Sequence, residues 1–248
     1  MKKTGIIVIL CVLGFTAILL SCSENSDKYL NLGIEKYKLG EYREAIQDFN
    51  KAVELDPNNS QAYFHRGLAN GALDNEQGRM QDLTKAIELN PNYSEAYNYR
   101  GFIKYLLYKD YRGAIQDFDK AIEINPYYGE AYNNRGSAKV SFAYRGEDTS
   151  KDYQDAIKDL NKAIQLEPNN PDFYSDRALA KNMSKDYQGA IQDYSKAIEL
   201  VPNDPKFYNS RALIKWLLYD MEGACSDWSK AGELGDTDAY DYIRKHCN

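Results

Sequence analysis

Histidine and cysteine are scarce in this sequence, with 2 His and 4 Cys among 248 residues. His65 and His246 lie far apart in the chain, and neither is accompanied by the spacing of a zinc site or of an orienting catalytic motif. A glycine-rich phosphate loop and a nucleophile elbow are also missing. We therefore expect no metal, no cofactor and no enzymatic activity.

Basic residues are outnumbered, since 31 Lys and Arg face 37 Asp and Glu and leave a formal net charge of −6. An acidic protein is repelled by phosphates, which argues against nucleic acid and against an anionic bilayer surface as ligands. The apolar run over residues 5–20 is 16 residues long, which is short for a membrane span.

The first 22 residues have the pattern of an export signal. Lys2 and Lys3 precede the apolar run, which ends in Leu19-Leu20-Ser21-Cys22. This ending resembles a bacterial lipobox, in which the chain is cut before the cysteine, so that Cys22 becomes the lipidated first residue. An uncleaved anchor and a plain signal peptide are the alternatives.

The lipobox resemblance implies a signal peptide over 1–21 and a short tether over 22–25, with a first helix that begins at Ser26 or Asp27. It places the protein in the bacterial cell envelope, at the outer membrane. Loss of Lys2 and Lys3 takes the formal charge from −6 to −8, so lipid rather than charge would hold the protein at the bilayer.

One ten-residue sequence motif occurs six times, and its most complete copy is DFDKAIEINP at 117–126. The copies recur with a period of about 34 residues, which predicts a stack of repeats, because each unit has an apolar face that only its neighbours can bury. They begin at Asp48, Asp82, Asp117, Asp159, Asp193 and Asp227.

The repeat resembles the tetratricopeptide repeat family, whose motif places aromatic and small residues at fixed positions of two helices. In the first repeat these positions hold Tyr29, Leu32, Gly33, Tyr37, Ala45, Phe49, Ala52 and Pro57. The resemblance implies an all-α fold, an α-solenoid with the form of a right-handed superhelix. Its six helix pairs, over 26–236, would occupy 26–59, 60–93, 94–128, 129–170, 171–204 and 205–236, followed by a capping helix over 237–248.

Three repeats depart from the pattern. Repeat two has Arg79 where the others have alanine, and Gly71 and Gly78 fall inside its helices. This predicts either a specialised hinge or docking point or, as we favour, a looser second helix with Arg79 extended outward. Repeat three has one extra residue within 106–110, and repeat four has eight around 144–151, which form either a partner-binding loop or a neutral one.

The C-terminal segment predicts a cap. Ala239, Tyr242, Ile243 and His246 fall on one stripe of a helix that would cover the last apolar face. Cys225 and Cys247 lie at one level on the two helices that meet at the preceding turn, which favours a disulfide over two free buried thiols.

A recurring arginine accompanies the recurring aspartate. Asp48 and Arg66, for example, lie equally far in sequence from Pro57 at the turn between the first two repeats, so the two are level across that turn. We therefore expect a ladder of ion pairs between repeats, with a binding role for the arginines as the alternative. The other arginines of the series are Arg100, Arg135, Arg177 and Arg211.

In the tetratricopeptide family, the first helices of the repeats line the groove that binds partners. The resemblance places amide and aromatic side chains there, which suit an extended peptide or a helix, although some of these residues could simply be buried. The candidates are Phe64, Asn98, Phe102, Tyr105, Asn133, Ser175, Asn182, Asn209 and Trp216, together with Leu68, Leu179 and Leu213.

We therefore expect a non-enzymatic adaptor, a membrane-anchored lipoprotein that binds envelope proteins or peptide segments in its groove. The alternative is a lipoprotein that binds a glycan or a small nutrient. A glycan site needs a local cluster of aromatic rings, whereas a peptide groove spreads its contacts over several repeats.

Overall fold

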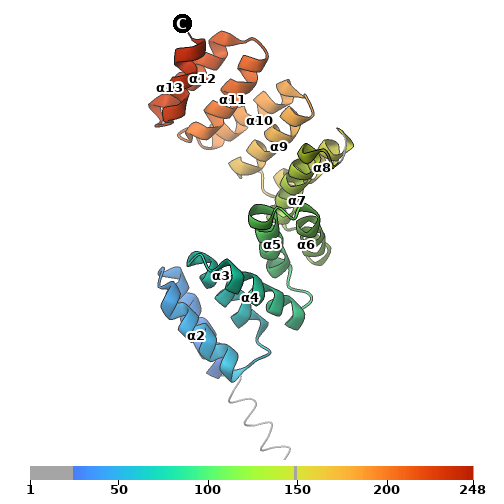
Figure 1. Ribbon diagram of the computed structural model, residues 1–248, viewed down its shortest axis with the longest axis vertical. Coiled ribbons are helices and arrows are strands. Elements are labelled where there is room, and N and C mark those ends of the chain that lie inside the picture. Colours follow the sequence, from blue (N-terminus) through green and yellow to red (C-terminus); the bar gives the residue numbers. More distant parts are fainter. Residues whose placement is uncertain (1–24, 148–149, 248) are drawn as a thin grey trace, which may run out of the picture. The chain divides into compact units, whose positions relative to one another are not determined.

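A computed structural model describes residues 25–147 and 150–247 (Figure 1). The chain divides into two compact units, unit 1 over residues 25–100 and unit 2 over the described residues from 101 to 247. All regular elements of the described residues are helices, which confirms the all-α solenoid fold expected from the sequence. The predicted signal peptide and Cys22 lie outside the described residues.

The described helices follow one another through short turns. Unit 1 begins with a helix over residues 25–38 and continues with α2 (Tyr42–Leu55), α3 (Ser60–Ala72), α4 (Glu76–Leu89) and most of α5 (Ser94–Ile103). Unit 2 contains the end of α5, then η1 (Lys104–Tyr108), α6 (Tyr111–Ile124), α7 (Gly129–Phe142), η2 (Ala143–Glu147), α8 (Ser150–Leu166), α9 (Pro171–Met183), α10 (Tyr187–Leu200), α11 (Pro205–Leu217), α12 (Met221–Glu233) and α13 (Thr237–His246).

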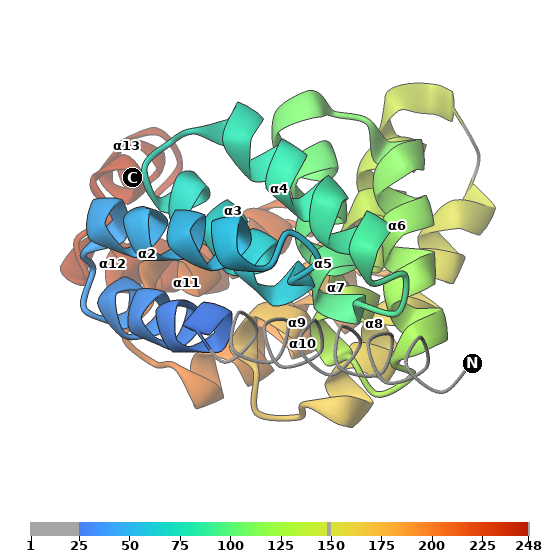
Figure 2. The same cartoon turned by 90° about the horizontal axis from the view of Figure 1, so that it is seen from below.

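The first helix is already formed at residue 25, so Ser26 is not the N-cap that the sequence suggested. Ser26 is fully buried on this helix, which lies beside α2 in Figure 2. Its Oγ donates to the carbonyl of Ala52 at 3.0 Å and accepts from Nδ2 of Asn59 at 3.1 Å. The serine therefore ties the two helices of repeat one together.

Small residues allow the helices to approach closely, as the repeat pattern predicts. A Cβ added at Gly33 would lie 2.5 Å from Cε1 of Phe49, which is fully buried in α2. Any larger residue there would force the ring out of place, at a cost of typically about 1 to 3 kcal/mol. The alanines that recur at one position of the second helices are also fully buried, namely Ala52, Ala86, Ala121, Ala163, Ala197 and Ala231.

The prediction for Arg79 was wrong, because its side chain does not extend outward and α4 is a regular helix. The side chain is 18% exposed and crosses Gly71, where an added Cβ would lie 2.6 Å from Cδ of Arg79. The glycine of α3 therefore makes the room that the arginine of α4 needs.

The extra residue of repeat three is accommodated by η1, a turn of π-helix, whereas the longer insertion of repeat four lies partly in η2 and partly in α8, which begins early at Ser150. A π-helical turn holds one more residue than an α-helical turn, and such turns often occur at functional sites. Lys109 ends η1 in the left-handed conformation (φ 54°), and Gly146 in η2 has φ 79°.

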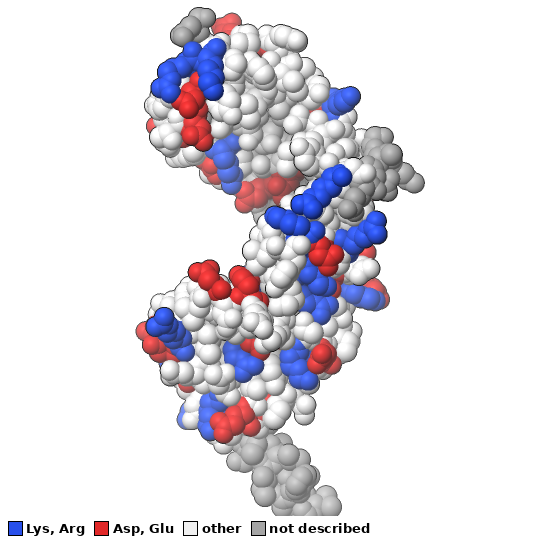
Figure 3. Space-filling model, viewed as in Figure 1, with Lys and Arg blue, Asp and Glu red and all other residues white. Residues whose placement is uncertain are grey.

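On the face drawn in Figure 3, Lys and Arg side chains gather over α6 and α7.

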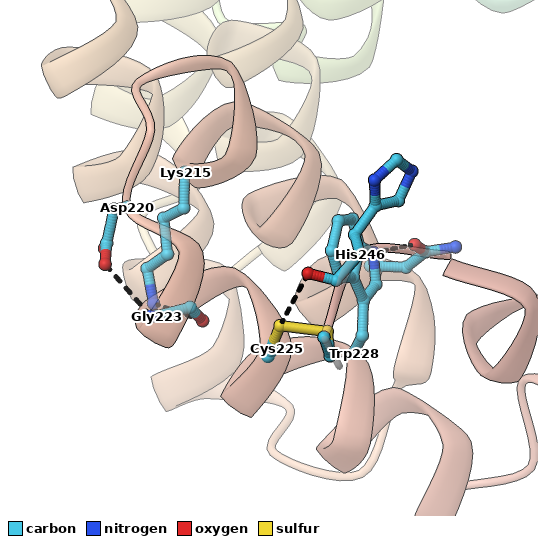
Figure 4. Close-up of a disulfide and its surroundings, with 8 residues drawn as sticks. Lys215, Asp220, Gly223, Cys225, Trp228 and His246 are labelled. Carbon is cyan, nitrogen blue, oxygen red and sulfur yellow. Dashed lines mark hydrogen bonds between the residues drawn. A yellow bond between two sulfur atoms is a disulfide. The ribbon is translucent and has the colours of Figure 1, made fainter. Parts of the chain in front are cut away.

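The C-terminal helix α13 covers the end of unit 2. Ala239 is fully buried, and Tyr242 and Ile243 pack against the cluster around Trp228. A disulfide joins Cys225 of α12 to Cys247, whose Cα atoms are 5.7 Å apart (Figure 4). The cap is therefore held by both packing and a covalent bond.

Reduction of this disulfide is expected to lower the free energy of unfolding by about 3 kcal/mol, because a closed loop of this length restricts the unfolded chain by about that much. Urea denaturation with and without reductant measures the difference. The double variant Cys225→Ala/Cys247→Ala is the control and should not respond to reductant. Identical urea midpoints for the oxidised and the reduced wild type would contradict the expectation.

Within the described residues, no helix has both the length and the apolar character needed to cross a membrane.

Candidate protein-binding surface

The recurring arginines are used to hold the repeats together. Arg66 binds the carboxylate of Asp82 through two hydrogen bonds of 2.9 and 2.6 Å, and its Nη1 donates to Asn50 of the preceding repeat at 2.8 Å. The main ion pair therefore lies within a repeat, and the predicted pairing with Asp48 was wrong. Asp48 instead pairs with Lys36. The same arrangement recurs for Arg135 with Asp159, Arg177 with Asp193 and Arg211 with Asp227.

Two further contacts occupy these arginines and aspartates. Arg177 lies over the ring of Tyr174 at 5.6 Å, and Lys181, one turn further along α9, pairs with Asp193 at 2.8 Å. The leading tyrosines of repeats two, three, four and six have the same contact with the arginine three residues later. These residues stabilise the array, which leaves little of the arginine side chain for a partner.

In unit 1, two of the predicted groove residues belong to the core. Phe64 is 6% exposed, and its ring centroid lies 4.8 Å from that of Tyr93 and 5.6 Å from that of Tyr99. Asn98 is 3% exposed. Tyr93, in the turn between repeats, folds over the first helix at Phe64. Neither Phe64 nor Asn98 can therefore form part of an exposed surface.

In unit 2, Asn133 of α7 takes part in a polar network with α9. Its Nδ2 donates to Oδ2 of Asp176 at 2.7 Å, and the hydroxyl of Ser137 donates to the same oxygen at 3.0 Å. Oδ1 of Asn133 is buried and accepts no hydrogen bond from the described residues. Burial raises the pKa of Asp176, while the two hydrogen bonds oppose that rise.

A carboxyl whose pKa is raised by folding adds stability below its unfolded pKa of about 3.9, and that stability is lost as the pH rises through the folded value. We therefore expect Asp176→Asn to unfold at a higher temperature than the wild type at pH 7. The difference should shrink as the pH falls towards 4, where the carboxyl of Asp176 takes up its proton. Melting curves across this range test the expectation, and a difference that does not vary with pH would contradict it.

Asn209 also has a structural role rather than an exposed one. Its Oδ1 accepts from Nε1 of Trp228 at 3.1 Å, and its Nδ2 donates to Asp236 at 2.8 Å. It therefore links α11 to α12 and to the N-cap of α13. Phe102 and Tyr105 are half-buried, the former against the cluster around Phe118, the latter with its hydroxyl 3.3 Å from Oγ of Ser141.

The predicted apolar residues that remain accessible lie on α9 and α11. Leu179 is 42% exposed, Leu213 is 38% exposed and Trp216 is 39% exposed. Leu179 and Leu213 are equivalent residues of consecutive repeats, and Trp216 lies on the same helical face as Leu213 because the two are three residues apart. We call these three side chains the apolar stripe. Ser175 and Asn182, both half-buried, flank Leu179 on its face of α9.

The two helices of the apolar stripe are linked at their first turns. Nζ of Lys206, at the start of α11, donates to Asp172, at the start of α9, at 3.0 Å. The ring of Trp216 lies 5.1 Å from that of His246 in the cap, which limits its freedom to turn away. Large apolar side chains held at the surface in this way are characteristic of a protein-interaction site.

The described residues contain no group of His, Cys, Asp and Glu side chains that could hold a metal ion.

Two sequence models of known families match the chain. One, described as TPR repeat, matches residues 33–74, 150–182 and 184–218, and the other, described as Tetratricopeptide repeat, matches residues 60–93. Together they cover just over half of the chain. The chain belongs to the tetratricopeptide repeat family. A search of curated proteins found no match.

Many solved structures have the same fold as this tetratricopeptide repeat protein. PilW, a type IV pilus biogenesis factor, is 18% identical with a TM-score of 0.76 over 88% of this chain and 97% of its own. PilF of Pseudomonas aeruginosa is 18% identical with a TM-score of 0.75 over 91% and 99%. YrrB, a TPR protein with an unusual peptide-binding site, is 19% identical with a TM-score of 0.57 over 76% and 92%. At these identities the likeness shows the fold alone.

Proposed function

We propose that this protein is a non-enzymatic adaptor that binds a segment of a partner protein along the apolar stripe of α9 and α11. The observation that carries the proposal is the exposure of Leu179, Leu213 and Trp216 on equivalent faces of neighbouring repeats. A segment laid across both helices would contact all three side chains and bury surface that is otherwise in water. The peptide-binding site named for YrrB and the pilus-biogenesis role named for PilW support a protein or peptide as the ligand.

An amide side chain near the stripe suits a peptide backbone. Asn182 occupies in α9 the place that Trp216 occupies in α11, and it is half-buried. A hydrogen bond from its amide to a peptide backbone would add specificity for an extended segment.

Capture of partner proteins tests the proposal. The wild type and the variant Leu179→Ala/Leu213→Ala/Trp216→Ala are used as baits, and the bound proteins are identified by mass spectrometry. We expect a protein that the wild type binds and the variant loses. The matched control is Leu39→Ala/Tyr127→Ala/Tyr219→Ala, which removes three exposed side chains outside the stripe and should keep the partner. If the wild type enriches no protein and an oligosaccharide raises its melting temperature, the glycan-binding alternative is correct instead.

We further propose that lipid on Cys22 anchors the protein in the bacterial cell envelope, at the outer membrane. The support is the basic start, the apolar run over 5–20 and the Leu-x-Ser-Cys ending. A first helix that is formed by residue 25 leaves only a short segment between Cys22 and the array, so the first repeat would lie close to the bilayer.

Cys22→Ser is expected to block this maturation, leaving a larger uncleaved form or a form that no longer sediments with membranes. Fractionation and immunoblotting of cells that produce each protein measure both properties. Cys11→Ser, which changes the other cysteine of the segment, is the control and should mature normally. A Cys22→Ser protein of wild-type size that is still bound to membranes would exclude the lipid anchor.

A further inference from the structure

Residues that follow η1, together with Tyr144 and Arg145 of η2, help to line a pair of adjoining cavities in unit 2. The first has a volume of about 380 Å³, and we call it the cationic pocket; its lining is Lys109, Asp110, Tyr111, Arg112, Phe142 and Arg145. The second, of about 370 Å³, shares Lys109, Tyr111 and Arg145 with the first and continues to Val140, Tyr144, Leu179 and Met183; we call it the apolar pocket. The cavities depend on the inserted residues, because η1 leads into Lys109 and η2 contains Tyr144 and Arg145.

The arginines of the cationic pocket differ from those of the Arg–Asp ladder. Cζ of Arg112 lies 5.2 Å from the ring centroid of Phe142, and Cζ of Arg145 lies 5.1 Å from that of Tyr111. Among the described residues, neither arginine has a carboxylate within ion-pair distance, whereas Arg66, Arg135, Arg177 and Arg211 each bind an aspartate. A guanidinium stacked on a ring keeps its N–H donors at the ring's edge, where they can bind an anion.

The charge of the pocket is positive in a protein that is acidic as a whole. Lys109, Arg112 and Arg145 are exposed, and the one carboxylate among the described lining residues is that of Asp110. Oδ1 of Asp110 already accepts the N–H of Gly113 at 2.9 Å as the N-cap of α6. The pocket therefore holds an excess of positive charge against a formal net charge of −6 for the chain.

The cationic pocket requires a negative charge in the ligand, and the apolar pocket requires an apolar group as well. Tyr144 is 71% exposed and Leu179 is 42% exposed, so an apolar side chain placed here would cover surface that is now in water. A ligand that fills both cavities must carry a negative charge next to an apolar group. An anionic bilayer fits less well, because the net negative charge of the protein opposes its approach to such a surface.

We propose that the cationic and apolar pockets together bind an acidic peptide segment of a partner protein, with its carboxylates on Arg112 and Arg145 and a neighbouring apolar side chain in the apolar pocket. The proposal rests on the proposed function, since Leu179 belongs both to the apolar stripe and to the apolar pocket. It adds a requirement for acidic residues that the stripe does not impose.

Fluorescence anisotropy with defined peptides tests this site on the full chain. The probe is a fluorescein-labelled octapeptide of glutamate and leucine, and the reference is the same peptide with glutamine in place of glutamate. We expect the glutamate peptide to bind more tightly and to lose affinity as salt is added. Arg112→Gln/Arg145→Gln should weaken its binding about tenfold, since two charge-assisted contacts are lost.

The matched control is Lys38→Gln/Arg43→Gln, which removes two exposed cations at the equivalent turn of repeat one and should change the affinity less than about twofold. Equal losses in the two double variants, or equal binding of the two peptides, would overturn the proposal. Binding of phosphatidylglycerol vesicles that depends on Arg112 and Arg145, without binding of the glutamate peptide, would assign the site to lipid and overturn it as well. In each of these cases, loss of a captured partner on changing the apolar stripe would still support the proposed function.

Discussion

Replacing Trp228 with alanine is expected to lower the free energy of unfolding of unit 2 by about 3 to 5 kcal/mol. The side chain is fully buried, and its ring stacks on that of Tyr242 at 5.2 Å. Its Nε1 also donates to Asn209, so the substitution leaves a cavity and removes the link between α11, α12 and the cap. Urea denaturation followed by circular dichroism measures the loss.

Trp216→Ala is the matched control for this experiment. Trp216 is 39% exposed, so its removal should cost less than about 1 kcal/mol. The two variants would then separate effects on the free energy of unfolding from effects on partner binding. Trp216 belongs to the apolar stripe, whereas Trp228 does not. Equal losses of stability in the two variants would contradict the packing described for the cap.

The second large effect is expected from Asp193→Ala. The substitution leaves Arg177 and Lys181, each 18% exposed, without the carboxylate that they share. Removing one partner of a largely buried ion pair typically costs about 3 to 5 kcal/mol, and we expect the lower end of that range here because both cations retain some contact with water. Urea denaturation again measures the loss.

Glu199→Ala removes one partner of the pair between Lys196 and Glu199, which is exposed at 46% and 66%. This control should change the free energy of unfolding by less than about 0.5 kcal/mol. If Asp193→Ala were no more costly than Glu199→Ala, the Arg–Asp ladder would have no structural importance.

The fold could be predicted because the same pattern of small and aromatic residues recurs in each repeat. The buried alanines and the contact between Gly33 and Phe49 lie where the pattern places them, since close packing tolerates no larger residue there. The cap could be predicted for a similar reason, because Ala239, Tyr242 and Ile243 form the apolar face of a helix that follows the last repeat.

The direction of the ion pairs could not be predicted from spacing. Asp48 and Asp82 lie at similar sequence distances on either side of Arg66, so both aspartates are nearly level with it on an antiparallel helix. The structure selects Asp82, and Arg66 reaches the preceding repeat through Asn50 instead. Distances along the chain do not distinguish two neighbouring helices that lie on either side of a third.

The candidate surface was predicted in part for a related reason. Phe64 and Leu213 both lie on first helices, yet Tyr93 covers Phe64, whereas Leu213 remains 38% exposed. Whether a turn residue folds over a helix depends on packing that the repeat pattern does not encode. The cationic pocket was missed because an extra residue can form a loop or a π-helical turn, and the sequence does not distinguish these outcomes.

Site-specific photo-crosslinking in cells that produce the protein tests directly whether the apolar stripe binds a partner protein. A photoreactive phenylalanine analogue is placed either at Leu213, in the apolar stripe, or at Tyr127, which is 79% exposed and lies in a turn between repeats outside the stripe. We expect a discrete protein adduct from position 213 that is lost when Leu179 and Trp216 are also changed to alanine, and no adduct from position 127. The same adduct from both positions, or none from position 213, would contradict the claim that the stripe on α9 and α11 binds a partner protein.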